Sequence, residues 1–491
     1  MTNLAVIPII LPLAAGVILA FLHNRTKARE WVAHLFAVLL VLFNIYLNWY
    51  VVTNGTIVLE TGEWKAPYGI VIVADSLSAI LVGITSIITL VLVYTSRTQI
   101  TDKMKQNYFY SFVFFLITGV SGAFLTGDLF NLFVFFEVLL MASYALIVVG
   151  ADKVQLRESI KYMLINMFSS VIFVTLVAFL YAVVGTVNMA QIAVRVQEVR
   201  QTGVLTTIAV LLFFVFATKA ALFPLYYWMP KSYSVPSPIV SALFGALLTK
   251  VGIYSILRVF SVIFIYDTDI VHQAFIWIAG LSMLFGVIGA LSTNNVKLII
   301  AYNIIPSIGF ILMGIGLFTH DSLNGSVYYL VHDMMIKTAL FLLVGAICYV
   351  AGTSDLKKMN GLIHTYPLLG WMLFIAAFVL AGIPPFSGFI GKIMLLQGAF
   401  EKGEIAIAII ALLTSLLILY SIMRIFIHAF WGTKDETVIK KPIKGYLPSI
   451  AILLTGSIIL GLGAELLLPT IDVISTDLLN PEHYIDSVIK E

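Results

Sequence analysis

Long apolar runs are the feature that most restricts how this chain can fold. A membrane-spanning helix needs about 20 mostly apolar residues, and the sequence holds many runs of that length. We interpret fourteen of them as spans, two of which are interrupted. They are expected near residues 4–22, 31–52, 70–95, 109–126, 129–150, 162–185, 204–229, 239–263, 271–292, 298–318, 326–350, 366–400, 405–430 and 447–469. The sequence therefore predicts an all-α polytopic membrane protein.

The composition excludes several classes of protein. Hydrophobic residues make up 61% of the chain and charged residues 11%, whereas a soluble globular protein has about 25% charged residues. The net charge of +3 comes without a basic block of the kind that binds nucleic acid. The single cysteine, Cys348, cannot form an internal disulfide or hold an iron–sulfur cluster. We therefore expect no cofactor, no metal and no nucleic-acid partner, with lipid as the surrounding medium.

Basic residues in the loops predict the orientation, because they favour the cytoplasmic side of a membrane. With the N-terminus placed outside, the positive loops gather inside, and an even number of spans puts both termini outside. Residues 186–203 can form either a short surface helix or a loop, and the sequence leaves both open. The basic residues expected outside are few: Lys65, Arg195, Arg200, Lys402 and Lys490.

Six basic residues fall within the apolar runs. Arg258 and Arg424 lie toward span ends, where a long side chain can reach the interface. A charge at the centre of a spanning helix costs about 2.5–3.5 kcal/mol, so the deeper residues are candidates for function. The deeper residues are Lys219, Lys250, Lys337 and Lys392.

Three further polar residues accompany these lysines. Glu137 has apolar neighbours on both sides. Asp333 lies one helical turn before Lys337, so this pair can simply neutralise itself. His332 suits a proton relay because imidazole titrates near neutral pH, but a buried histidine that bonds to a neighbouring helix explains it as well.

Prolines predict a break in two spans. Pro224 interrupts one, and Pro384 and Pro385 interrupt the other. Proline removes a backbone donor, and the freed carbonyl needs a partner inside a membrane. A packing kink explains one such helix, but two breaks with a lysine near each favour a functional role.

The two breaks also suggest a duplication. Spans four to eight and nine to thirteen form two five-helix units, with the broken helix fourth in each. Because five is odd, the second unit is inverted, as in many transporters. The expected parts are a three-helix segment (1–108), a first proton-path repeat (109–263), a second repeat (264–431), and a last span with a short outer tail (432–491).

These groups suggest a proton path. Burial disfavours the charged form of a lysine, and a nearby carboxylate restores it. Our hypothesis is that Glu137 holds Lys219 protonated. When that contact weakens, the proton passes through Lys250, then through Lys337 with His332, to Lys392.

Five stretches of sequence carry a family resemblance. The chain resembles the antiporter-like subunits shared by respiratory complex I, membrane-bound hydrogenases and Mrp-type cation/proton antiporters, and within them it is most similar to the D-type Mrp subunits. The proton-path residues of that family fall on Glu137, Lys219, Lys250 and Lys392. Gly245 departs from it, since many complex I relatives have histidine there. The stretches are residues 73–78, 127–137, 219–225, 330–337 and 382–389.

The resemblance implies a transporter subunit rather than an enzyme. It would provide the H⁺ channel of a multisubunit complex that exchanges Na⁺ for H⁺ across the cell membrane, beside the A, B, C, E, F and G subunits. The alternative is a proton-pumping subunit of a complex I-type quinone oxidoreductase or a membrane-bound hydrogenase. A purely structural scaffold leaves the four deep lysines and the two breaks unexplained.

Overall fold

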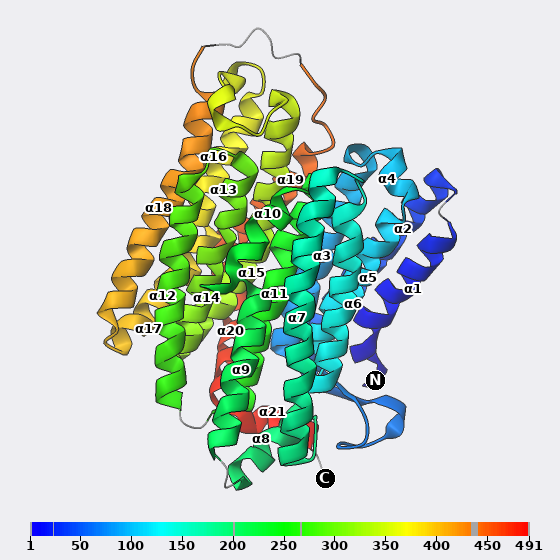
Figure 1. Ribbon diagram of the computed structural model, residues 1–491, viewed down its shortest axis with the longest axis vertical. Helices are drawn as coiled ribbons and strands as arrows, with labels where there is room; N and C mark the ends of the chain where they lie inside the picture. Colours follow the sequence, from blue (N-terminus) through cyan, green and yellow to red (C-terminus); the bar gives the residue numbers. More distant parts are fainter. Residues whose placement is uncertain (1, 23, 200–201, 266–267, 434–439, 490–491) are drawn as a thin grey trace.

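The computed structural model describes residues 2–22, 24–199, 202–265, 268–433 and 440–489. Arg200 and Lys490, both expected outside, lie beyond the described residues. Within these ranges the chain is almost entirely helical, and its long helices run roughly parallel in one bundle (Figure 1). The prediction of an all-α membrane protein is confirmed.

Among the described residues, eleven helical segments are long and apolar enough to cross a membrane, or up to twelve if one bent pair counts as a span. Two shorter apolar helices accompany them, α5 and α16. Reaching the expected fourteen requires counting α5 and the α16–α17 pair as spans too. The longer helices are α1 (Ile7–Phe21), α2 (Thr26–Asn54), α3 (Ser76–Gln99), α5 (Phe109–Leu125), α6 (Leu129–Val148), α7 (Lys153–Val184), α9 (Thr202–Ala220), α11 (Pro238–Val262), α12 (Thr268–Ser292), α14 (Ile304–Leu317), α15 (His320–Ala351), α16 (Pro367–Ala381), α17 (Ser387–Glu401), α18 (Ile405–Phe430), α19 (Leu447–Leu462) and α20 (Ala464–Leu479).

Short helices connect or cover these elements. α8 forms in the segment that the sequence left open between helix and loop, and α21 packs against it at the lower end of Figure 1. The short helices are α4 (Asp102–Gln106), α8 (Met189–Glu198), α10 (Met229–Ser234), α13 (Val296–Tyr302) and α21 (Pro481–Val488).

A small hairpin precedes α3, where the sequence analysis expected the start of a span at residue 70. β1 (Ile57–Glu60) pairs antiparallel with β2 (Val71–Ala74), with Ile57 opposite Ala74. The helix begins only at Ser76, because Asp75 caps it by accepting a 2.9 Å hydrogen bond from the Ser78 amide. That expected start was wrong, since hydropathy does not separate a buried strand from a helix.

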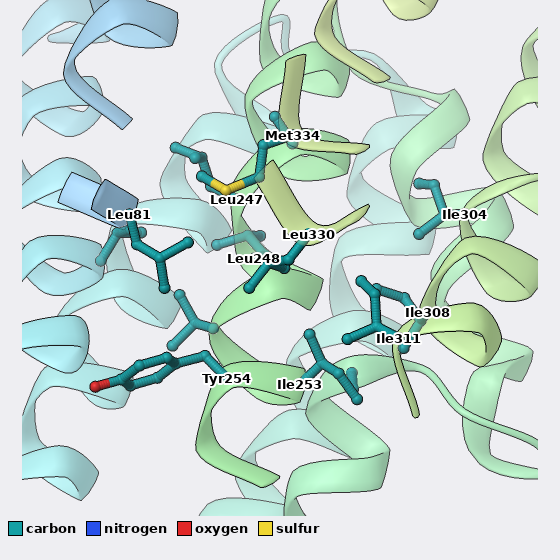
Figure 2. Close-up of a cluster of buried hydrophobic side chains, with 14 of the residues drawn as sticks. Leu81, Leu247, Leu248, Ile253, Tyr254, Ile304, Ile308, Ile311, Leu330 and Met334 are labelled. Carbon is teal, nitrogen blue, oxygen red and sulfur yellow. The ribbon is translucent and has the colours of Figure 1, made fainter. Parts of the chain in front are cut away.

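The centre of the bundle is formed by α11 and α15. Every residue from Ile239 to Val262 of α11 is buried, and α15 packs against α11, α14 and α17. Figure 2 shows apolar side chains of α3, α11, α14 and α15 filling the space between these helices. Ionisable groups in the middle of α11 and α15 therefore lie in a close-packed apolar interior, whereas His320 and Asp321 at the start of α15 are partly exposed.

The two predicted breaks occur. Regular helix ends at Ala220 in α9 and at Ala381 in α16, and residues 382–386 separate α16 from α17. The Phe223–Pro224 and Pro384–Pro385 peptide bonds are cis.

A third interruption was not predicted. α13 ends at Tyr302, and after Asn303 the chain continues as α14. The expected span 298–318 corresponds to one candidate span, Val296–Leu317, that is interrupted at Asn303.

The end of the chain also differs from the expectation. α19 and α20 meet at a bend of 75°, and helix α20 continues past Pro469 to Leu479. The expected short outer tail is thus helical, and α20 packs on α15 and α3. Pro469 is the sixth residue of α20, so the Glu465 carbonyl lacks its intrahelical donor there.

Candidate functional site

Lys250 lies at the centre of the bundle with no exposed surface. Its Nζ donates to the Gly245 carbonyl at 2.8 Å and lies 2.6 Å from Oδ2 of Asp333 on α15. A buried ammonium is costly unless it is paired and hydrogen-bonded, and this lysine has both kinds of partner. Helix α11 is thereby joined to α15 through one ion pair.

Asp333 also faces Lys337, the lysine of its own helix α15. Its Oδ1 lies 3.6 Å from Nζ of Lys337, which is likewise fully buried. The sequence analysis paired Asp333 with Lys337 alone, but the shorter contact goes to Lys250. One carboxylate therefore lies between two amino groups that come from different helices.

Lys337 has a further partner at the unpredicted helix break. Its Nζ donates to the Asn303 carbonyl at 2.7 Å, which the interruption between α13 and α14 leaves accessible. The Asn303 amide in turn donates to Ser421 Oγ of α18 at 3.0 Å and to the Ile299 carbonyl at 2.8 Å. The break thus supplies an oxygen ligand for a buried lysine.

Lys392 shows the same arrangement at the second predicted break. Its Nζ donates to the carbonyls of Leu380 at 3.1 Å and Ala381 at 2.9 Å, at the end of α16. The carbonyl end of a helix carries partial negative charge, which stabilises a cation. The Lys392 amino group also lies 4.6 Å from the ring centre of Phe310. A cationic group fits this position without a carboxylate.

His332 lies next to the break before α17. Its Nδ1 is 2.8 Å from Ser387 Oγ, and its ring is 5.2 Å from that of Tyr329. Its Nε2 is buried and has no hydrogen-bond partner in the described part of the chain. A Cβ added to Gly388 would lie 3.1 Å from the imidazole. The ring is therefore held closely on one side and unpaired on the other.

Lys219 occupies the last turn of α9, just before the first break. Its Nζ donates to Ser170 Oγ of α7 at 3.1 Å and lies 4.8 Å from the ring centre of Phe136. Trp228 Nε1 donates to the Thr218 carbonyl at 3.1 Å, which gives one carbonyl near the break a partner. Lys219 is thus bound by a hydroxyl and an aromatic face.

Glu137 does not contact Lys219 as an ion pair. No ion pair within 4.0 Å involves Glu137 among the described residues, although it lies on α6 next to Phe136. The carboxylate is half-buried, and its Oε1 is buried without a hydrogen-bond partner in the same part of the chain. Lys219 contacts Phe136, the residue before Glu137 in α6, but Lys219 and Glu137 do not form the direct pair that the hypothesis requires.

The structure therefore brings together some of the predicted residues and not others. Lys250 and Lys337 meet through Asp333, whereas Glu137, Lys219 and Lys392 each lie in a separate polar setting. Close packing links these settings. A Cβ on Gly252 of α11 would lie 2.8 Å from the backbone carbon of Lys219. The polar groups thus form separate clusters within the bundle, with apolar side chains between them. We call these clusters stations: Lys219 with Glu137 nearby, Lys250 with Asp333 and Lys337, and Lys392 with His332.

One expectation about the basic residues was wrong. Arg258 does not reach the interface alone, because it is buried and its Nη2 lies 2.5 Å from Oδ2 of Asp75. Its Nε donates to Tyr254 OH at 3.2 Å, and its guanidinium lies 5.0 Å from the Tyr484 ring. Asp75 is distant in sequence, so hydropathy gave no sign of the pair.

Asp128 lies near this end of the bundle and caps α6. Its Oδ1 accepts a 2.7 Å hydrogen bond from the Asn131 amide. Burial raises the pKa of Asp128 to about 6, against the lowering effect of the amide hydrogen bonds from Asn131 and Phe130. This end of the bundle holds a carboxyl group that titrates closer to neutrality than usual.

Sequence reasoning missed three residues of the site. Asp333 was considered only as a partner of Lys337, Ser170 was not considered, and the Asn303 carbonyl becomes a ligand only because α13 ends there. The single available signal was the charge of Asp333 inside an apolar run.

Comparison with known proteins gives consistent results. The family described as "NADH:quinone oxidoreductase/Mrp antiporter, TM" matches residues 126–418. The D subunit of the Na(+)/H(+) antiporter of Bacillus subtilis (strain 168) is 51% identical over 496 aligned residues, covering 100% of both chains. The protein of the same name from Alkalihalophilus pseudofirmus is 47% identical over 493, again covering 100% of both.

A solved structure has the same fold over its whole length. One chain in the structure of the Mrp complex from Dietzia sp. DQ12-45-1b superimposes with a TM-score of 0.92. It is 29% identical in sequence, and the superposition covers 100% of both chains.

Proposed function

Because the chain belongs to the NADH:quinone oxidoreductase/Mrp antiporter transmembrane family, we propose that it is the proton-carrying subunit of a multisubunit Na⁺/H⁺ antiporter. It acts as part of a transporter and not as an enzyme. Two relatives that match the full chain are named as the D subunits of Na(+)/H(+) antiporters. The observation that carries the proton assignment is the carboxylate of Asp333 between the buried amino groups of Lys250 and Lys337.

The charge balance of that cluster supports proton transfer. One carboxylate compensates one ammonium, so a fully buried cluster with two protonated lysines carries an uncompensated charge. The cluster is therefore most stable with one proton shared between Lys250 and Lys337. A proton arriving on one lysine favours release from the other, which is the property a relay needs.

The remaining stations extend the path in both directions. Lys219, with Glu137 nearby, forms one end, while His332 and Lys392 form the other. The described side chains of these stations are not in direct contact, so protons cross the gaps through water that enters transiently. Glu137 acts by electrostatic attraction on Lys219 across Phe136, at a separation longer than an ion pair.

The breaks serve the path by exposing backbone carbonyls. Pro224 ends the regular helix beyond Lys219, and Pro384 and Pro385 end it beside Lys392. In a membrane, irregular backbone is tolerated only where it is covered by protein or lines a polar cavity. Lys392 supplies the donor for the freed carbonyls at the second break.

We propose the finer topology on the same basis. The chain crosses the membrane fourteen times when α5 and the α16–α17 pair are counted as spans, with both termini outside. Residues 1–108 form the N-terminal segment, residues 109–263 and 264–431 the two inverted repeats, and residues 432–491 the final part. The proposed partners are the A, B, C, E, F and G subunits of the antiporter, and Na⁺ crosses elsewhere in that complex.

Reconstitution tests this proposal. The purified complex is placed in vesicles with a trapped pH-sensitive dye, and a Na⁺ gradient is imposed. We expect proton movement coupled to Na⁺, lost on Glu137→Ala or Lys219→Ala. Na⁺ flux through this subunit without proton movement would reverse the assignment of the proton half.

The subunits that co-purify with this chain distinguish the antiporter from the redox alternative. A complex I-type pump or a membrane-bound hydrogenase contains soluble redox subunits, whereas an antiporter consists of membrane subunits alone. Identifying every subunit of the purified complex distinguishes the two. Co-purifying redox subunits would overturn the antiporter assignment without affecting the relay.

A further inference from the structure

A charged cavity lies at the end of the bundle where α2 begins, near α4 in the upper part of Figure 1. Its volume is about 410 Å³. The start of α2 and the last turn of α3 form its walls, and the path described above uses none of these groups. The lining residues are Lys27, Glu30, Trp31, His34 and Arg97.

The cavity has an excess of positive charge. Glu30 is already paired, since its Oε1 lies 2.6 Å from Nζ of the buried Lys105 and its Oε2 lies 3.7 Å from Arg97. Asp102 contributes only a 3.9 Å contact to Lys105 at the exposed edge. Lys27 has no ion pair among the described residues. Among the lining residues, the two cationic side chains of Lys27 and Arg97 face one carboxylate, Glu30, which is also shared with Lys105.

A further feature of the wall favours an anion. The first backbone N–H groups of α2 also lie here, and the N-terminus of a long helix attracts negative charge.

An apolar surface runs from the cavity along the same face of α2. Trp31 is 70% exposed at the level of the cavity, and Leu35, Leu42 and Ile45 are 56%, 59% and 58% exposed below it. Their spacing follows the helical repeat, so they form one continuous stripe. A ligand that is charged at one end and apolar at the other can therefore use both surfaces.

We propose that this cavity binds the phosphate of an anionic phospholipid headgroup, with the acyl chains lying along the exposed face of α2. Lys27 and Arg97 contact the phosphate, and Trp31 lies at the membrane interface. Basic residues near a membrane surface favour anionic lipids. A free phosphate ion satisfies the charges but leaves the apolar stripe unused, so the lipid is the better match.

Lipid retention by the purified complex tests the proposal. The complex is equilibrated in detergent with phosphatidylglycerol, with phosphatidylcholine or with inorganic phosphate, and the bound molecules are counted by native mass spectrometry. We expect phosphatidylglycerol to be retained in preference to the other two. The double substitution Lys27→Gln with Arg97→Gln weakens its binding about 30-fold, taking about 1 kcal/mol for each basic residue.

A matched double variant controls for loss of surface charge. Lys153 and Arg157 are exposed in the first turns of α7 and lie outside the charged cavity, so Lys153→Gln with Arg157→Gln leaves phosphatidylglycerol retention unchanged. Equal retention by the Lys27/Arg97 variant and the parent overturns the proposal. Equal binding of phosphatidylcholine removes the anionic specificity, and equal binding of inorganic phosphate shows a free-ion site instead.

Discussion

Replacing Asp333 by asparagine removes the negative charge shared by Lys250 and Lys337 while keeping the shape of the side chain. The two amino groups lie 2.6 Å and 3.6 Å from the carboxylate oxygens. At an effective dielectric constant of about 20, the attraction to the carboxylate is about 6 kcal/mol for a charged Lys250 and about 5 kcal/mol for a charged Lys337. The carboxylate is thus the largest single stabilisation of a proton in this cluster.

The net loss is smaller than these values, because the asparagine oxygen still accepts a hydrogen bond. Removing one partner of a buried ion pair costs about 3–5 kcal/mol. At about 1.4 kcal/mol per factor of ten, the protonated share of the cluster falls by a factor of roughly 150 to 5,000. We expect Na⁺-driven proton exchange in vesicles to drop at least about 100-fold.

Two controls separate transport from assembly. Asp321→Asn removes a carboxylate from the first turn of the same helix, away from the buried cluster, and keeps the parental rate. The double variant Asp333→Leu with Lys250→Met replaces the buried pair by apolar side chains, so the complex assembles but does not exchange protons. An Asp333→Asn complex that exchanges protons at the parental rate would refute the reasoning.

Four further predictions concern single groups. Ser170→Ala removes the hydroxyl bound by Lys219 and lowers exchange about 10-fold, taking about 1.5 kcal/mol for a charged hydrogen bond, whereas Ser169→Ala, whose hydroxyl bonds only to a backbone carbonyl, leaves the exchange rate unchanged. Lys392→Gln has no cationic group to place at the end of α16, so we expect it to abolish proton exchange. A native gel checks that the complex still assembles, and a normal exchange rate in that complex contradicts a role of Lys392 in the proton path. The pKa of Asp128 in the folded protein is about 6, above its usual 3.8, so the stability of the folded state falls as pH rises through about 6. Asp128→Asn keeps the helix cap and therefore raises the unfolding temperature at pH 8 but not at pH 4. The gain in folding free energy at pH 8 is at most about 3 kcal/mol. Gly252→Ala places a methyl group 2.5 Å from the Ala220 amide nitrogen and lowers the unfolding temperature, whereas Gly203→Ala meets nothing within 4 Å and does not; equal unfolding temperatures argue against the close approach of α9 and α11.

Features that depend on local chemistry were predictable from the sequence. Proline removes a backbone donor and disfavours regular helix, and Pro224 and Pro384 placed both breaks correctly, although α1 and α20 continue through Pro12 and Pro469. The cost of a charge in hydrocarbon marked Lys219, Lys250, Lys337 and Lys392, and all four are buried.

Features that depend on which helices become neighbours were not predictable. Asp333 contacts Lys250 only because α15 packs on α11, and Arg258 meets Asp75 only because α11 packs on α3. The break at Asn303 had a local signal that the sequence analysis did not use, because Pro306 leaves the carbonyl of Tyr302 without its intrahelical donor. Glu137 was expected to pair with Lys219, but the Phe136 ring and Ser170 take the contacts of that amino group.

The most direct test of the proton path is the initial rate of Na⁺-driven proton movement in vesicles that contain the complex with Lys250→Gln. This residue lies on the fully buried α11, between the two halves of the path. We predict a rate at background level, and a parental rate for Lys231→Gln, which alters an exposed lysine of α10. A parental rate for the Lys250 variant, in a fully assembled complex, contradicts a path through the centre of this subunit.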